Sequence, residues 1–158
     1  MKQDLKPMSI FFRVIAVIAI GAAIGVTIFF IYTLMLRTDY KETMLEVNDK
    51  VVKYEDSAMI RQGGESLPAS PAVVNWYDSF LLSSNTVVYS RDAAEQNEKT
   101  IWLILGDSSL AFTGVENDSA IHILWCTPGG EKSFRVRSTT SFNQMEAYFK
   151  NYKRRESN

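Results

Sequence analysis

The stretch AIGAAIGVTIFFIYTLML, from Ala19 to Leu36, contains no charged residue. The uncharged apolar run that includes it begins at Val14 and is 23 residues long. As a helix, a run of this length measures roughly 34 Å, which exceeds the roughly 30 Å hydrocarbon core of a bilayer. A helix in a soluble core is rarely apolar on all sides for so long. The run therefore predicts a transmembrane helix over residues 14–36.

The end of the run distinguishes a permanent anchor from a cleavable signal. A signal peptide has an apolar region of about 7–15 residues, followed by small residues at the cleavage site. Here the run is longer, and it ends in bulky residues at positions 32–36, directly before Arg37. We therefore expect an uncleaved anchor that crosses the membrane once.

The flanking cations bear on the orientation. Three precede the run and three follow it closely: Lys2, Lys6 and Arg13, then Arg37, Lys41 and Lys50. The two sets are nearly balanced under the positive-inside rule, and the free N-terminal amine adds to the first. We expect residues 1–13 to form a short cytoplasmic tail. The remainder of the chain would then lie outside the cytoplasm, which in a bacterial inner membrane is the periplasmic side.

The composition after the anchor excludes some classes of protein. Residues 37–158 contain 14 Lys and Arg and 17 Asp and Glu, a net charge of −3. A nucleic-acid-binding domain is usually strongly basic, so we expect no nucleic-acid partner. Cys126 is the only cysteine, which excludes an intrachain disulfide and a disulfide-stapled secreted module.

Residues 37–60 continue as a predicted juxtamembrane helix. Its apolar residues recur at alternating spacings of four and three, and we name them the heptad stripe: Tyr40, Met44, Val47, Val51 and Tyr54. This spacing is typical of a coiled coil, but it covers fewer than three heptads. Two alternatives stay open: the stripe packs on a partner helix, or it packs on its own domain.

Gly21 and Gly25 form a Gly-x-x-x-Gly pair inside the apolar run. Small residues at this spacing let two membrane helices approach closely. Together with the heptad stripe, the pair predicts a helix–helix interface that joins two copies of the chain or the chain and another membrane protein.

The remaining sequence predicts a linker and then one small domain. Residues 61–70 contain Gly63, Gly64 and Pro68, as a linker does. Ser70-Pro71 resembles the start of a helix. Beyond it, five runs with strand character lie within residues 86–138, and a helical stripe follows from Phe142. We expect residues 71–158 to form an α+β domain, in which an antiparallel sheet of about five strands packs with one preceding helix and a C-terminal helix. The run 101–105, apolar on both faces, predicts a central strand covered on both sides.

One short motif suggests chemistry. Gly106-Asp107-Ser108 after a strand resembles the nucleophile block of the GDSL hydrolases, and the resemblance implies that Ser108 is a nucleophile. That family also uses an Asp-x-x-His near its C-terminus, whereas the only histidine here is His122 and residue 119 is serine. A hairpin turn explains the same residues. His122 and Cys126 lie about 13 Å apart on one strand, too far to pair. We predict no catalytic, cofactor-binding or metal-binding residues and no enzyme activity.

These expectations favour a structural or interaction subunit of a bacterial envelope complex. The layout of one span, two helices, an antiparallel meander and a C-terminal helix resembles the single-span scaffold subunits of type IV secretion and conjugation systems. In those subunits the exported domain is similar to nuclear transport factor 2, and the resemblance implies other envelope proteins as partners. A sensory or regulatory membrane protein that binds a ligand or partner is the alternative, and a serine hydrolase is a remote one.

Overall fold

The computed structural model describes residues 7–82, 86–92, 94–114, 120–137 and 142–156. It divides into two compact units, Met1–Met35 and Leu36–Asn158. Helix α1 (Pro7–Tyr54) begins in the first unit and ends in the second. Within the described residues, α1 is the one helix long and apolar enough to cross a membrane. Its side chains from Ile10 to Tyr32 are all exposed, as expected of a surface that faces lipid.

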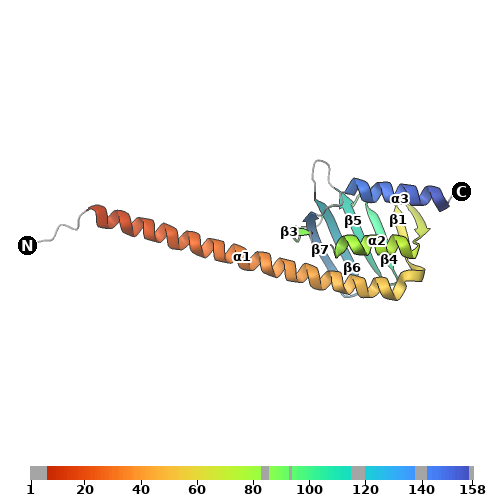
Figure 1. Cartoon of the computed structure of the whole chain (residues 1–158), viewed down its shortest axis with the longest axis horizontal. Coiled ribbons are helices and arrows are strands. Elements are labelled where there is room, and N and C mark those ends of the chain that lie inside the picture. The colour runs from red at the N-terminus through yellow and green to blue at the C-terminus, as the bar shows by residue number, and fades with distance from the viewer. Residues whose placement is uncertain (1–6, 83–85, 93, 115–119, 138–141, 157–158) are drawn as a thin grey trace, which may run out of the picture. The chain divides into compact units, whose positions relative to one another are not determined.

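A seven-stranded antiparallel sheet forms the centre of the second unit (Figure 1). Its order is β2-β1-β4-β5-β6-β7-β3, so β2 and β3 are the two edge strands. The strands are β1 (Met59–Gln62), β2 (Glu65–Pro68), β3 (Val87–Ser90), β4 (Ile101–Leu105), β5 (Ser108–Gly114), β6 (Ile121–Thr127) and β7 (Gly130–Arg137). A short 3-10 helix, Glu55–Ser57, connects α1 to β1.

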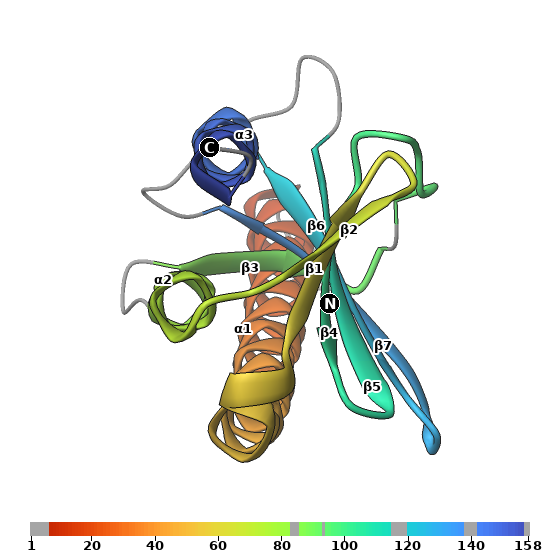
Figure 2. The same cartoon turned by 90° about the vertical axis from the view of Figure 1, so that its right-hand side faces the viewer.

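Three helical segments pack on one face of this sheet: α1 from Leu36 onward, α2 (Pro71–Leu81) and α3 (Phe142–Glu156) (Figure 2). Alternate strand residues point toward them, and one continuous core results. Tyr77 of α2 stacks on Phe112 of β5 with ring centroids 5.2 Å apart. The expected start of α2 is confirmed, because the Val73 and Val74 amides donate to the Ser70 carbonyl at 2.9 and 3.1 Å.

The α+β class is confirmed, but the sheet has seven strands where the sequence predicts about five. The two additional strands, β1 and β2, form a hairpin where the sequence predicts the linker 61–70. Gly63 and Gly64 make its two-residue turn, with φ values of 56° and 83°. The predicted helix 37–60 accordingly ends at Tyr54, and the compact unit begins at Leu36 instead of residue 71.

The opposite face of the sheet is crossed by the segment between β3 and β4, residues 91–100, of which residue 93 is not described. Ser133 Oγ of β7 donates to the Arg91 carbonyl at 2.5 Å, and Gln62 Nε2 of β1 donates to the Lys99 carbonyl at 2.7 Å. Under this segment, β5 is buried on both faces, whereas Trp102 and Ile104 of β4 are only half-buried. The expectation that strand 101–105 is covered on both sides is therefore wrong for its second face.

Candidate functional site

The heptad stripe is part of the core of its own domain. Met44 is 1% exposed, Val47 is fully buried, and Tyr40 and Val51 are also buried. Tyr54 is half-buried and packs against the same core. Of the two alternatives that the sequence leaves open, the structure places the stripe against its own sheet. A partner helix would reach these side chains only if the domain opened.

Tyr40 lies near the start of this packed segment and contacts β7. Its ring meets Phe134 edge to face, with centroids 5.2 Å apart. Such aromatic pairs contribute about 0.5–1.5 kcal/mol beyond the area they bury. Burial raises the pKa of the Tyr40 hydroxyl far above its ordinary value, so the side chain stays neutral at physiological pH.

Three ion pairs link the same helical segment to the residue after β3, to β7 and to the β4–β5 turn. Asp39 pairs with Arg91 at 2.8 Å, Glu46 with Lys132 at 3.6 Å, and Lys50 with Asp107 at 2.7 Å. The three helix residues are spaced seven and four apart, which puts them on one side of α1. Charges at helical spacing are visible in the sequence, but their partners lie 52, 86 and 57 residues away and only the fold brings them together.

Gly21 and Gly25, the other predicted interface residues, lie in the exposed apolar part of α1. A Cβ atom added at either glycine would meet nothing within 4 Å. The polar groups nearby are satisfied within the helix, since Thr27 Oγ1 donates to the Ala23 carbonyl at 2.9 Å and Thr33 Oγ1 to the Phe29 carbonyl at 2.8 Å. The surface beside the glycines is therefore smooth and apolar. The helix–helix interface at Gly21 and Gly25 stays a prediction.

Ser108 lies at the start of β5, on the helix-covered face, and is 2% exposed. Its hydroxyl donates to Asp107 Oδ1 at 2.9 Å. His122 lies on the opposite face of the sheet, on β6, where it is paired with Thr113. The sheet thus separates the hydroxyl from the imidazole that a GDSL-like mechanism would require as its base. Gly106, with φ 65°, and Asp107 form the β4–β5 turn, as the hairpin interpretation predicts.

His122 and Cys126 share the second face of the sheet, as strand alternation predicts. His122 Nδ1 lies 3.2 Å from the Asp92 carbonyl, which belongs to the crossing segment 91–100. The Cys126 thiol donates to Glu131 Oε1 at 3.8 Å, and burial is the main reason that its pKa is raised above the ordinary value. A raised thiol pKa disfavours the nucleophilic thiolate. The contacts of the two side chains thus differ: His122 lies against the crossing segment, and Cys126 contacts Glu131 of β7.

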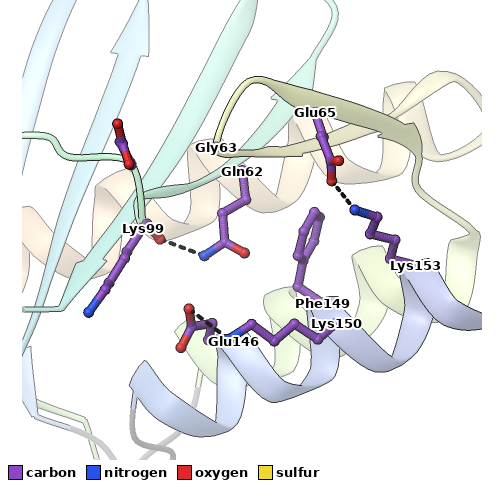
Figure 3. Close-up of a pocket in the computed structure, with 9 residues that line it drawn as sticks. Gln62, Gly63, Glu65, Lys99, Glu146, Phe149, Lys150 and Lys153 are labelled. Atoms are coloured by element: carbon purple, nitrogen blue, oxygen red, sulfur yellow. Dashed lines mark hydrogen bonds and ion pairs between the residues drawn. The ribbon is translucent and has the colours of Figure 1, made fainter.

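A groove of about 310 Å³ lies between α3 and the β1–β2 hairpin (Figure 3). Three acidic and three basic side chains line it: Glu65, Glu98, Glu146, Lys99, Lys150 and Lys153. Lys153 pairs with Glu65 across the groove, and Lys150 pairs with Glu146 along α3 at 3.1 Å. The ring of Phe149 lies at its base between these pairs. Because the charges are mutually compensated, the groove does not favour a ligand of either sign.

Among the described residues, no group of three or more His, Cys, Asp and Glu side chains is arranged to hold a metal ion. Comparison with protein-family models, curated proteins and solved structures found no match to this chain. The functional argument therefore depends on how the anchor and the domain are built.

Proposed function

We propose that this chain is a single-pass membrane subunit that presents its α+β domain at a membrane surface and acts through contacts with other membrane or envelope proteins. The observation that carries the proposal is that Leu36 has two roles. It is the last residue of the apolar run, and it is also a core residue of the domain, 2% exposed. No flexible linker intervenes between a possible membrane span and the domain. A single helix, α1, therefore contains both the candidate membrane span and a segment of the domain core, which is compatible with a subunit that acts through contacts at a membrane surface.

The finer parts of the proposal are a bacterial inner membrane, an N-terminus in the cytoplasm and a periplasmic domain within a secretion, conjugation or similar complex. The free N-terminal amine, added to three cations on each side of the run, favours a cytoplasmic N-terminus slightly, and a single cysteine is compatible with a periplasmic domain. A homodimer through Gly21 and Gly25 is compatible with it. We propose no enzymatic role, because Ser108 is buried on the face opposite His122.

The direct test is a pull-down of the full-length chain in mild detergent through a C-terminal tag, with the mass of the eluted complex measured. We expect stoichiometric membrane partners. Carbonate extraction of the membranes is the matched control for anchoring, since an integral protein stays in the pellet. A chain that carbonate releases, or one that elutes without a partner and without self-association, contradicts the proposal.

A sensory role is the second candidate, and the packed heptad stripe favours it. Because Tyr40, Met44, Val47 and Val51 are core residues, any ligand-driven rearrangement of the sheet would act directly on α1. The discriminating observation is whether a copurifying kinase, protease or transcription regulator responds to a small molecule. If the copurified complex has the same composition with and without metabolites from a cell extract, the scaffold role is favoured over the sensory role.

A further inference from the structure

A hollow of about 420 Å³ lies on the face of the sheet opposite the helices. Arg61 of β1 and Trp102 of β4 are cross-strand partners there, and both alternate with core residues that point toward the helices. The β1–β2 turn and the loop before β4 form the rest of the lining. We call this space the Trp102 hollow. Every residue that lines it belongs to the compact unit Leu36–Asn158, so the hollow is a feature of the domain alone.

Two opposite charges, those of Arg61 and Glu98, line the Trp102 hollow without pairing with each other. Among the residues that the structure describes, the Glu98 side chain makes no hydrogen bond or ion pair. The guanidinium carbon of Arg61 lies over the Trp102 ring, 5.4 Å from its centre, and the guanidinium N–H groups have no acceptor among the described residues. In the groove beside α3, in contrast, two ion pairs bring opposite charges together. The hollow therefore presents one open cation and one open anion.

The loop that carries Glu98 is held in place by hydrogen bonds. The Asn97 amide donates to Thr100 Oγ1 at 3.0 Å, the Lys99 amide to Asn97 Oδ1 at 2.9 Å, and the Thr100 amide to the Asn97 carbonyl at 2.9 Å. The bond from Gln62 Nε2 to the Lys99 carbonyl ties the same loop to β1 (Figure 3). A ligand would therefore meet a wall that is ordered before it binds, which lowers the entropic cost of binding.

The size of the hollow and its two charges suit a short peptide with free ends. A hollow of this volume is about 7 Å across, which is also the length of two extended residues. Arginine binds a carboxylate through two parallel hydrogen bonds, and a carboxylate accepts strong hydrogen bonds from an ammonium group. We propose that the Trp102 hollow binds a zwitterionic dipeptide, whose carboxylate pairs with Arg61 and whose ammonium group pairs with Glu98.

The half-buried indole ring of Trp102 provides an apolar surface for this ligand. Small-molecule sites combine aromatic side chains with a few polar groups that fix the orientation of the ligand. Because Arg61 lies over the ring, the residue at the carboxylate end of the dipeptide lies next to Trp102, and an apolar side chain is favoured there. A ligand with a single charge would leave either Arg61 or Glu98 without a partner. The inference goes beyond the proposed function and does not depend on it, since the hollow lies within the domain.

The test is isothermal titration calorimetry of the full-length chain in detergent, with alanyl-leucine as the probe. N-acetyl-alanyl-leucine, which lacks the ammonium group, and alanyl-leucine amide, which lacks the carboxylate, are the matched control ligands. We expect saturable binding of the free dipeptide. Both blocked forms should bind about tenfold more weakly or worse, because each loses a charged hydrogen bond. Titration into detergent alone corrects for partition of the ligand into micelles.

Two variants assign the ends of the ligand. Arg61→Gln should weaken the binding of alanyl-leucine about tenfold and remove the difference between the dipeptide and its amide. Glu98→Gln should weaken it similarly and remove the difference between the dipeptide and its N-acetyl form. Lys99→Gln and Glu95→Gln remove the same charges from nearby positions outside the hollow, and should leave the affinity unchanged. Melting temperatures establish that each variant is folded.

Three results overturn the proposal. The first is the absence of saturable binding at millimolar alanyl-leucine. The second is equal binding of the free and blocked dipeptides, which indicates an apolar contact alone. The third is a loss of affinity in the Lys99 and Glu95 variants that equals the loss in the Arg61 and Glu98 variants. The membrane role is judged separately, by carbonate extraction and the pull-down.

Discussion

The ring of Tyr54 lies directly against Gly106: a Cβ atom at Gly106 would come within 2.5 Å of the tyrosine Cζ. Gly106 also has φ 65°, a left-handed conformation that other residues adopt at a cost of about 1–2 kcal/mol. The end of α1 and the β4–β5 turn therefore fit together only because residue 106 has no side chain.

Gly106→Ala should destabilise the domain through both the backbone and the contact. Gly64→Ala is the matched control, since Gly64 has φ 83° and open space around its Cβ position. We expect the Gly106 change to cost about 1–3 kcal/mol more than the Gly64 change, which is the usual range for overpacking. Urea unfolding of the detergent-solubilised chain, followed by tryptophan fluorescence, measures both. If Tyr54→Ala does not remove the excess, the ring contact is not its cause.

Met44→Ala should destabilise the domain by about 2–5 kcal/mol, because it opens a cavity in the core. Leu45→Ala, on the next residue of the same helix, should have an effect within about 0.5 kcal/mol, since Leu45 is 50% exposed. Both changes lower the apolar content of α1 similarly. Equal effects on the unfolding midpoint would mean that the stripe does not pack on the sheet.

The Lys50–Asp107 pair predicts a specific dependence of stability on pH. The hydrogen bond from Lys50, followed by that from Ser108, holds the pKa of Asp107 below its usual range. Because the folded pKa is lower than the unfolded one, the stabilisation is present above about pH 4 and is lost as the pH falls through the folded pKa. The pKa of Lys50 is raised, chiefly by the same hydrogen bond, so its contribution is lost only as the pH rises above about 10.

Asp107→Asn tests this dependence, since asparagine keeps an acceptor oxygen for Ser108 but loses the charge. The melting temperature of the wild type should exceed that of the variant by a small, constant amount between pH 6 and 8, roughly the neutral range in which neither group titrates. The difference should shrink below about pH 4. A difference that is the same at pH 3, roughly one unit below the ordinary carboxyl pKa, would show that charge at residue 107 does not contribute.

Gly21→Leu with Gly25→Leu should lower the cross-linked dimer fraction in detergent, because the larger side chains keep two helices apart. Ala23→Leu adds the same side chain two residues from each glycine, on the other side of the helix, and should leave the dimer unchanged. An unchanged oligomeric state in the double glycine variant would remove the glycine pair from the interface hypothesis.

The sequence predicts the span, both later helices and strands β3 to β7, because each has a clear pattern of apolar, β-branched or aromatic residues. It misses the β1–β2 hairpin because both strands are short and mostly polar, and only Ile60 and Leu67 pack toward the core. A Gly-Gly pair between two short extended runs is a known hairpin signal, but the same pair is also typical of a linker. The sequence alone therefore does not distinguish the two.

The heptad stripe shows a second limit of prediction from the sequence. Periodicity identifies which side of a helix is apolar, but it does not identify what covers that side. Here the cover is a sheet whose strands lie between 59 and 137 in the sequence. The same holds for Tyr89 and Arg135, which are far apart in the chain and are brought together by the pairing of β3 with β7.

The pairing of Val87 with Arg137 has a consequence for biosynthesis. β3 is synthesised before β4, β5 and β6, yet its only partner among the described strands, β7, is the last strand to be made. Closure of such a non-local pair is slow, because the loop entropy is lost before the contact is gained. If the domain is exported as proposed, β3 waits unpaired while the next 40 or so residues cross the membrane, roughly the length separating it from β7. During that time the unpaired strand is open to pairing with other chains, so the order of synthesis adds a risk of aggregation.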